Sequence, residues 1–303
     1  MQQRFKTPMN HYRSLLLAIL LTACAPDPLA SPSPTADFNS QAPANAAAVV
    51  LVPAGEFIMG DDHGMIDEQP AHPVYLDAFW LDQTEVTNEA YRLCVEAGKC
   101  DLPSDISYFE DSAYANHPVV FVSWRDAAAY CSFAGKRLPT EAEWEKAASW
   151  NPSTNEKFKY PWGNDFDCAK ANFDDETELD ASLMPGGTTG CDGFVRSAPV
   201  GSFPLGASPY GALDMAGNVW EWVHDAFIET DPLLFPEQKN YYAISPYNNP
   251  QGVDPSNTEY RLMRGGSWNW TFGFGRSTYR LWFGLDDSYD GVGFRCAADN
   301  SEK

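Results

Sequence analysis

RGGSWNWTFGFGRSTYRLWFGLDDSYDGVGFRC, from Arg264 to Cys296, is the stretch that decides the fold. Aromatic side chains and arginines alternate along it, and glycines open and close it. Aromatic residues supply most of the buried area in cores and at interfaces, and arginine forms paired hydrogen bonds to carboxylates. The stretch therefore predicts a system of core strands, a binding surface, or both.

Two further motifs precede this stretch in the chain. They are DMAGNVWEW at 214–222 and KRLPTEAEW at 136–144. Together the three motifs resemble the sulfatase-modifying-factor family, that is, formylglycine-generating-enzyme-like domains, over about Val49 to Asp299. The resemblance implies a single α+β domain of C-type-lectin-like topology, with short strands, a few helices and long loops. We expect this domain to cover residues 48–303.

Local patterns predict several of its elements. Apolar runs predict strands, and side chains that can cap a helix predict helix starts. The expected strands cover 48–52, 56–60, 72–82 and 117–122. The expected helices follow Thr87, Ser123 and Thr140, the last two with capping partners at Asp126 and Glu143.

The composition of the chain limits the size of its core and the kinds of partner that it can bind. The chain has 303 residues, of which 44% are hydrophobic, so it can bury a sizeable core in one large domain or two small ones. Its formal net charge of −22 argues against nucleic acid or an anionic membrane surface as a partner. An acidic surface suits solvation and hard cations such as calcium.

The N-terminus reads as a targeting segment. A basic region is followed by the short apolar run Leu15–Leu21, and Leu21–Cys24 resembles a bacterial lipobox. We expect residues 1–23 to be a lipoprotein signal peptide, Cys24 to carry lipid, and 24–47 to form a flexible Pro/Ala/Ser tether. The protein would then be exported and anchored to the cell envelope, at the outer membrane or cell surface. The alternative is an ordinary secretory signal cleaved near Ala25 or Ala30.

The remaining cysteines are even in number, as expected for an oxidising compartment. Cys94 and Cys100 flank a small loop around Gly98, and proximity favours their pairing. Cys168 and Cys191 are paired by elimination. The family resemblance implies a long-range disulfide between Cys131 and Cys296.

The resemblance also implies two calcium sites. Side-chain and carbonyl oxygens in tight loops are suitable ligands for calcium. The first set falls on Asn172, Phe173, Asp192 and Phe194, and the second on Asp214, Gly217, Val219 and Glu221. The alternative for Asp214 and Glu221 is a buried carboxylate paired with an arginine.

Copper is not expected. Oxidases of the family carry two copper-binding cysteines after the GGS motif, and counting without gaps places them at Trp270 and Gly275. No cysteine stands between Cys191 and Cys296. Since Cu(I) selects soft thiolates, copper-dependent formylglycine generation is doubtful for this chain. The iron-binding helical domain and histidine motif of another family branch are absent from the sequence as well.

Three functions are compatible with these observations. The preferred one is a module that binds a peptide, protein or glycan through Trp270, Arg276, Arg280 and Trp282, because other lectin-like members of the family use this C-terminal region as a ligand surface. The second is an oxidoreductase of the formylglycine-generating type or another family reaction. The third is a structural envelope protein.

Overall fold

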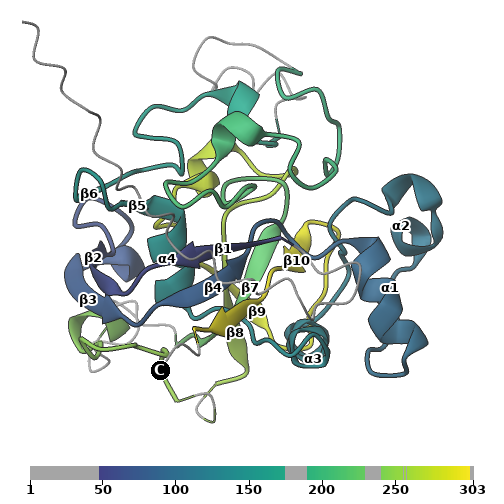
Figure 1. The fold of residues 1–303 in the computed structure, drawn as a ribbon, viewed down its shortest axis with the longest axis horizontal. Coiled ribbons are helices and arrows are strands. Elements are labelled where there is room, and N and C mark those ends of the chain that lie inside the picture. Colours follow the sequence, from purple (N-terminus) through teal and green to yellow (C-terminus); the bar gives the residue numbers. More distant parts are fainter. Residues whose placement is uncertain (1–47, 175–189, 229–239, 255, 257, 301–303) are drawn as a thin grey trace, which may run out of the picture. The chain divides into compact units, whose positions relative to one another are not determined.

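A computed structural model describes residues 48–174, 190–228, 240–254, 256 and 258–300. The expected signal peptide, the tether and Cys24 lie outside the described residues. Those that are described fall within one compact unit, Pro43–Lys303. They form a mixed α+β structure with short strands and long loops, which confirms the predicted fold class (Figure 1).

The elements are short. The α-helices are α1 (Asn88–Glu96), α2 (Ser107–Glu110), α3 (Trp124–Phe133) and α4 (Glu141–Ser149). The strands are β1 (Val49–Val52), β2 (Gly55–Met59), β3 (His72–Leu76), β4 (Phe79–Asp82), β5 (Trp150–Asn151), β6 (Glu156–Lys157), β7 (Trp220–Ala226), β8 (Tyr260–Arg264), β9 (Leu281–Gly284), β10 (Val292–Phe294) and β11 (Ala297–Asp299). Single turns of 3₁₀ helix include η2 (Ile66–Glu68), η4 (Cys168–Lys170), η5 (Pro204–Gly206) and η8 (Phe272–Gly275).

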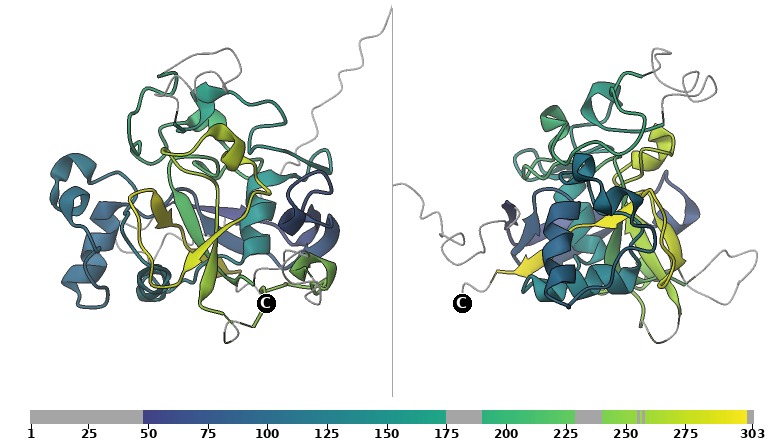
Figure 2. Two further views of the ribbon diagram at one scale, coloured as in Figure 1. Left: turned by 180° about the vertical axis from the view of Figure 1, so that it is seen from behind. Right: turned by 90° about the vertical axis from the view of Figure 1, so that its right-hand side faces the viewer.

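The stretch that decides the fold forms two strands, of which β10 is buried and β9 is half-buried. It contributes β9 and β10 to a four-stranded sheet with the order β10-β7-β8-β9, in which only β10 and β7 run parallel. These strands come from distant parts of the chain yet lie side by side, as the green and yellow ribbons of Figure 2 show. A second sheet has the order β1-β4-β11, so the C-terminal strand closes onto the N-terminal ones.

Helix α4 lies at the centre of the charge network described below. It packs against β2 and β3 on one side and against β7 and β8 on another (Figure 1). All nine of its residues are buried, including three glutamates and a lysine. The predicted capping box of Thr140 and Glu143 starts the helix.

Two strand predictions differ from the structure. Residues 72–82 form two strands in separate sheets. The buried positions are even-numbered in the first strand, at Val74 and Leu76, and odd-numbered in the second, at Phe79 and Leu81. Because side chains alternate between the two faces of a strand, one continuous strand could not bury all four. The expected strand over 117–122 is absent. Phe121 has a φ of 59°, a left-handed conformation that interrupts an extended strand.

The remaining local predictions are confirmed. Thr87 and Ser123 cap α1 and α3, the latter in a capping box with Asp126. The three predicted disulfides, Cys94–Cys100, Cys131–Cys296 and Cys168–Cys191, are formed. Among the described residues, no helix has the length and apolar character needed to cross a membrane.

Candidate functional site

The arginines of the C-terminal stretch meet buried carboxylates. Arg264 is fully buried at the end of β8, where its guanidinium binds Glu145 at 2.5 Å. It also donates to the backbone carbonyls of Ser277, Thr278 and Tyr279, at 2.7 to 2.9 Å. One arginine therefore fixes both α4 and the loop that precedes β9.

The two arginines predicted to contact a ligand are held in the same way. Arg280 is 7% exposed and forms a paired interaction with Glu141 of α4, at 2.7 and 3.0 Å. Arg276 binds both oxygens of the buried Glu68 in η2, at 2.8 and 2.7 Å. Both guanidiniums thus connect the stretch to other parts of the domain.

The two predicted tryptophans lie in separate aromatic groups. Trp270 makes edge-to-face contacts with Trp220 and Phe274, and Tyr279 completes what we call the aromatic cluster. Trp282 instead stacks on Phe227, with ring centroids 5.3 Å apart. Both tryptophans keep partly exposed surface. The structure does not bring the four predicted contact residues together in one cavity.

The second thiol position of the family oxidases is closed by packing. A Cβ atom placed on Gly275 would lie 2.1 Å from the ring of Phe173. The same ring lies against Gly266, where a Cβ would come within 3.0 Å of it. Phe173 therefore fills the space that a side chain at position 275 would need.

The structure brings three residues of the first predicted calcium set together. The carboxylate of Asp192 accepts hydrogen bonds from the backbone N–H groups of Phe173 and Phe194, at 3.0 and 2.8 Å. Asn172 is 1% exposed, and its side-chain oxygen Oδ1 is buried without a hydrogen-bond partner. Since a buried acceptor of this kind is costly, the set fits a cation that would be coordinated by Asn172 Oδ1.

The second set is only partly available. Glu221 binds Arg295 through both carboxylate oxygens, each at 2.7 Å, and accepts a hydrogen bond from the Trp144 indole at 2.8 Å. This is the pairing with an arginine that the sequence left open as an alternative. The carboxylate of Asp214 accepts a hydrogen bond from the backbone N–H of Gly201 at 2.6 Å.

Glu85 is a site residue that the sequence analysis missed. It is 1% exposed, its buried oxygen Oε2 receives no hydrogen bond from an N–H group of the described residues, and its carboxyl group forms a hydrogen bond with that of Asp214. Its other oxygen accepts from Asn218, which also accepts from Asn172 and so joins the two sets. Burial and the negative charge of Asp214 raise the pKa of Glu85 well above its ordinary value. No local pattern signals this role, because Glu85 lies in a short connection before α1.

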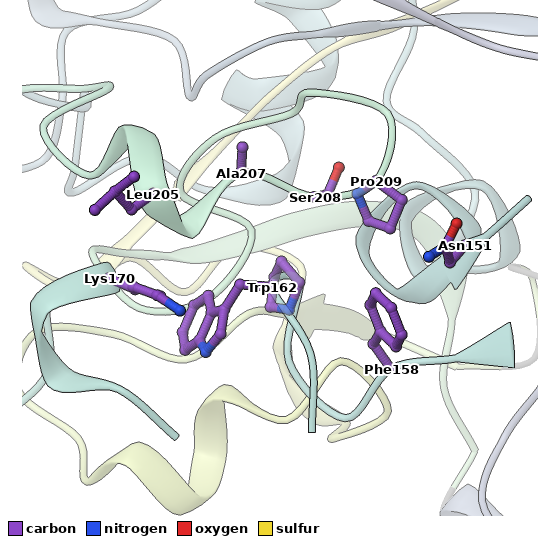
Figure 3. A pocket seen from close by; sticks show the side chains of 9 residues that line it. Asn151, Phe158, Trp162, Lys170, Leu205, Ala207, Ser208 and Pro209 are labelled. Atoms are coloured by element: carbon purple, nitrogen blue, oxygen red, sulfur yellow. The ribbon is translucent and has the colours of Figure 1, made fainter. Parts of the chain in front are cut away.

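None of these residues lines the open cavity of about 380 Å³ shown in Figure 3. Trp162, Phe158 and Lys170 form one wall, and the segment from Leu205 to Pro209 forms the other. The Trp162 indole is oriented by its hydrogen bond to the carbonyl of Asp165 and by stacking on Tyr160. Among the described residues, no three histidine, cysteine, aspartate or glutamate side chains gather as metal ligands.

A family profile identifies the chain. The profile of the sulfatase-modifying factor enzyme 1-like domain matches residues 34–300, so the match begins within the stretch expected to be a tether. The protein belongs to this family. Its sulfatase-modifying-factor fold had been implied by the three motifs, and the described structure agrees with it.

Two relatives have similar sequences. The chain is 31% identical over 273 residues to hercynine oxygenase of Mycolicibacterium smegmatis, covering 79% of this chain and 58% of that protein. It is 32% identical over 339 residues to the formylglycine-generating enzyme of Streptomyces coelicolor, covering 89% and 96%. The chain thus spans little more than half of the first relative.

A solved structure supports the fold. PvdO from Pseudomonas aeruginosa superimposes with a TM-score of 0.63 at 26% identity, over 83% of this chain and 94% of that one. The agreement extends over nearly the whole of the smaller protein. It shows that the sulfatase-modifying-factor fold is shared.

Proposed function

We propose that this member of the family binds a peptide, protein or glycan ligand and does not carry out copper-dependent formylglycine generation. The observation that supports the proposal is the state of the thiols. All six cysteines of the described residues are in disulfides, and Trp270 and Gly275 stand at the copper-ligand positions. An indole N–H donates but cannot ligate copper, and Phe173 leaves no room for a side chain at position 275.

Copper binding and turnover test this proposal. The purified domain is expected to bind no Cu(I) in competition with a dithiolate-strength chelator, and to leave a cysteine-containing sulfatase peptide at its original mass. A formylglycine-generating enzyme with its cysteine pair serves as the positive control. Formylglycine produced above a no-enzyme control, and abolished by a copper chelator, would falsify the proposal.

Exposed aromatic surface supports the binding role. Trp162 presents a pre-oriented ring beside the cavity of Figure 3, and Trp270 and Trp282 keep partly exposed faces. Rigid aromatic rings bind ligands at little entropic cost. On glycan and peptide arrays, Trp162→Ala and Trp270→Ala should reduce ligand capture. Arg280→Lys is less informative, because Arg280 is already occupied by Glu141.

Calcium is the cofactor that we propose. Asn172, Asp192 and the carbonyls of Phe173 and Phe194 would hold one ion and stiffen the loop against which Gly275 packs. For the second ion, Glu85 and Asp214 supply carboxylates while Glu221 is held by Arg295. Gly217 and Val219 would supply carbonyl oxygens.

A second candidate function is an oxidoreductase. The similarity to hercynine oxygenase and to a formylglycine-generating enzyme favours it. Oxygen consumption by the protein with sulfur-containing substrates tests this candidate separately from the copper assay. In either case we propose that the protein is exported and anchored through Cys24, as the lipobox-like sequence predicts.

A further inference from the structure

A second open cavity, of about 630 Å³, lies beside the start of α3 and of β8. Trp124 and Arg125 line it from α3. Thr258, Glu259, Tyr260 and Arg261 line it from β8 and the residues before it, so one carboxylate stands beside the two arginines in the wall. Its volume is within the range of small-molecule sites. None of the residues of the aromatic cluster contributes to it.

Arg261 differs from the other buried arginines. It is 5% exposed, yet among the residues that the structure describes it forms no ion pair with a carboxylate. Its guanidinium donates to the carbonyls of Thr258 and Tyr260, at 3.1 and 2.9 Å, and lies 4.9 Å from the Trp124 ring centroid. Its Nε atom is buried without a partner.

A buried charge of this kind is costly unless an opposite charge meets it. Burial and the nearby Arg125 lower the pKa of Arg261, so the surroundings oppose its charge. Arg125 is exposed and pairs with Asp286 at the surface, at 2.7 Å. Two guanidiniums therefore lie close together in a chain that carries 42 acidic and 20 basic residues.

We propose that this cavity binds the oxyanion of a small ligand, a carboxylate or a sulfate, between Arg261 and Arg125. Guanidinium groups match such oxyanions in shape and charge. The Thr258 hydroxyl accepts from the backbone N–H of Tyr260 at 3.0 Å, which leaves its own proton available to donate. The half-exposed Tyr260 ring offers apolar contact to the rest of the ligand. This site goes beyond the proposed function, since it depends neither on copper chemistry nor on the aromatic cluster.

The test is a titration of the full chain at constant ionic strength, followed by NMR of the Trp124 indole N–H, which donates to the carbonyl of Val223 at 2.7 Å. Sodium sulfate, glucuronate and uncharged glucose are the three probes. Sulfate and glucuronate should shift this signal saturably, and glucose should not. Tighter binding of glucuronate would assign the oxyanion to a sugar, and equal binding would assign it to a free inorganic ion.

Variants separate the site from a structural role of Arg261. Arg261→Gln should weaken anion binding by about tenfold or more, the value of one charge-assisted hydrogen bond. Arg125→Gln, at an exposed position, should weaken it as well and keeps the test valid if Arg261→Gln does not fold. Arg92→Gln is the matched control, because Arg92 also lies over an aromatic ring and binds a carbonyl, but outside the cavity. No saturable shift in the wild type, or unchanged affinity in a folded Arg125→Gln, would overturn the proposal.

Discussion

Two buried charge clusters in this protein are balanced differently. In the first, which we call the α4 cluster, Glu141 and Glu145 meet Arg264, Arg280 and Lys157. In the second, the Glu85 cluster, the carboxyl groups of Glu85, Asp214 and Glu221 share the single arginine Arg295. The second cluster therefore carries surplus negative charge.

The pKa directions follow this difference. Burial by itself raises the pKa of Glu145, but Lys157 and Arg264 more than offset that effect and lower it. Burial raises the pKa of Glu85, and Asp214 raises it further. The comparison shows that cations balance Glu141 and Glu145, whereas the Glu85 cluster needs a proton or a cation. Beside the α4 cluster, the buried Asp225 behaves like Glu85, because burial and the charge of Glu141 raise its pKa well above the ordinary value.

The largest effect is expected from Arg295→Met. This change leaves Glu221, Glu85 and Asp214 buried without their shared cation. Removing one partner of a buried pair typically costs about 3–5 kcal/mol, and we expect the free energy of unfolding in urea to fall by that amount. Lys170→Met is the control, because its partly exposed pair with Asp167 at 3.4 Å should contribute less than about 1 kcal/mol. Equal losses in the two variants would contradict the comparison.

The sequence predicted local features and missed the balance of charge. Ser123 with Asp126 lie three residues apart, so their capping box is readable from the chain itself. The EAEWEKAAS segment predicted a helix, but nothing in it indicates that all nine residues are buried. Glu145 meets Arg264 across 119 positions, and only the tertiary fold sets such a distance.

The same distinction applies to the candidate site. The residues of the Asn172 set came from the family resemblance, and the structure brings Phe173 and Phe194 together at Asp192; calcium binding by this set stays a prediction. The sequence could not show whether Arg280 contacts a ligand or Glu141, because a free guanidinium and one paired with a buried glutamate look alike in sequence. Burial, which only packing determines, separates the two.

Calcium removal should give the next largest effect. A ligand that binds only the folded state at 100 times its Kd adds about 2.7 kcal/mol, so chelation should lower the Tm. Asp192→Asn should reduce the calcium-dependent shift by the part that the first set contributes, because it weakens the charge of that set. Asp286→Asn, at the surface, should leave that shift intact. A melting curve that does not change with chelator would argue that the Glu85 cluster is neutralised by a proton instead.

A smaller and pH-dependent effect is expected at Lys146, the neighbour of Glu145 on α4. Its ammonium is buried and donates only to the carbonyls of Pro53 and Gly55 among the described residues, both at 2.9 Å. Burial lowers the pKa of Lys146 to about 8. The unfolded chain still holds this proton up to about pH 10.4, so the contribution of Lys146 to stability should increase between about pH 8 and that value.

Lys146→Met tests this directly. The free energy of unfolding in urea is measured for wild type and variant at about pH 7, 8.5 and 10. Both proteins contain the same tyrosines, so the effect of tyrosine titration cancels in the difference between the two free energies. The variant should gain stability relative to wild type below pH 8 and lose that advantage as the pH rises. A difference that does not depend on pH would show that Lys146 is neutral, or solvated, throughout this range.

The smallest effect on stability should come from Cys24→Ser. Both charge clusters lie after residue 48, so this change should leave the unfolding curve of the domain unaltered. It should nevertheless remove palmitate labelling and release the protein from the membrane fraction, because the lipobox-like Leu21–Cys24 sequence has no other thiol to acylate. Ala25→Ser, next to the proposed lipid site, should keep the label and serves as the control. An ordinary secretory signal gives a different result, since wild type and Cys24→Ser would then be equally unlabelled and equally soluble.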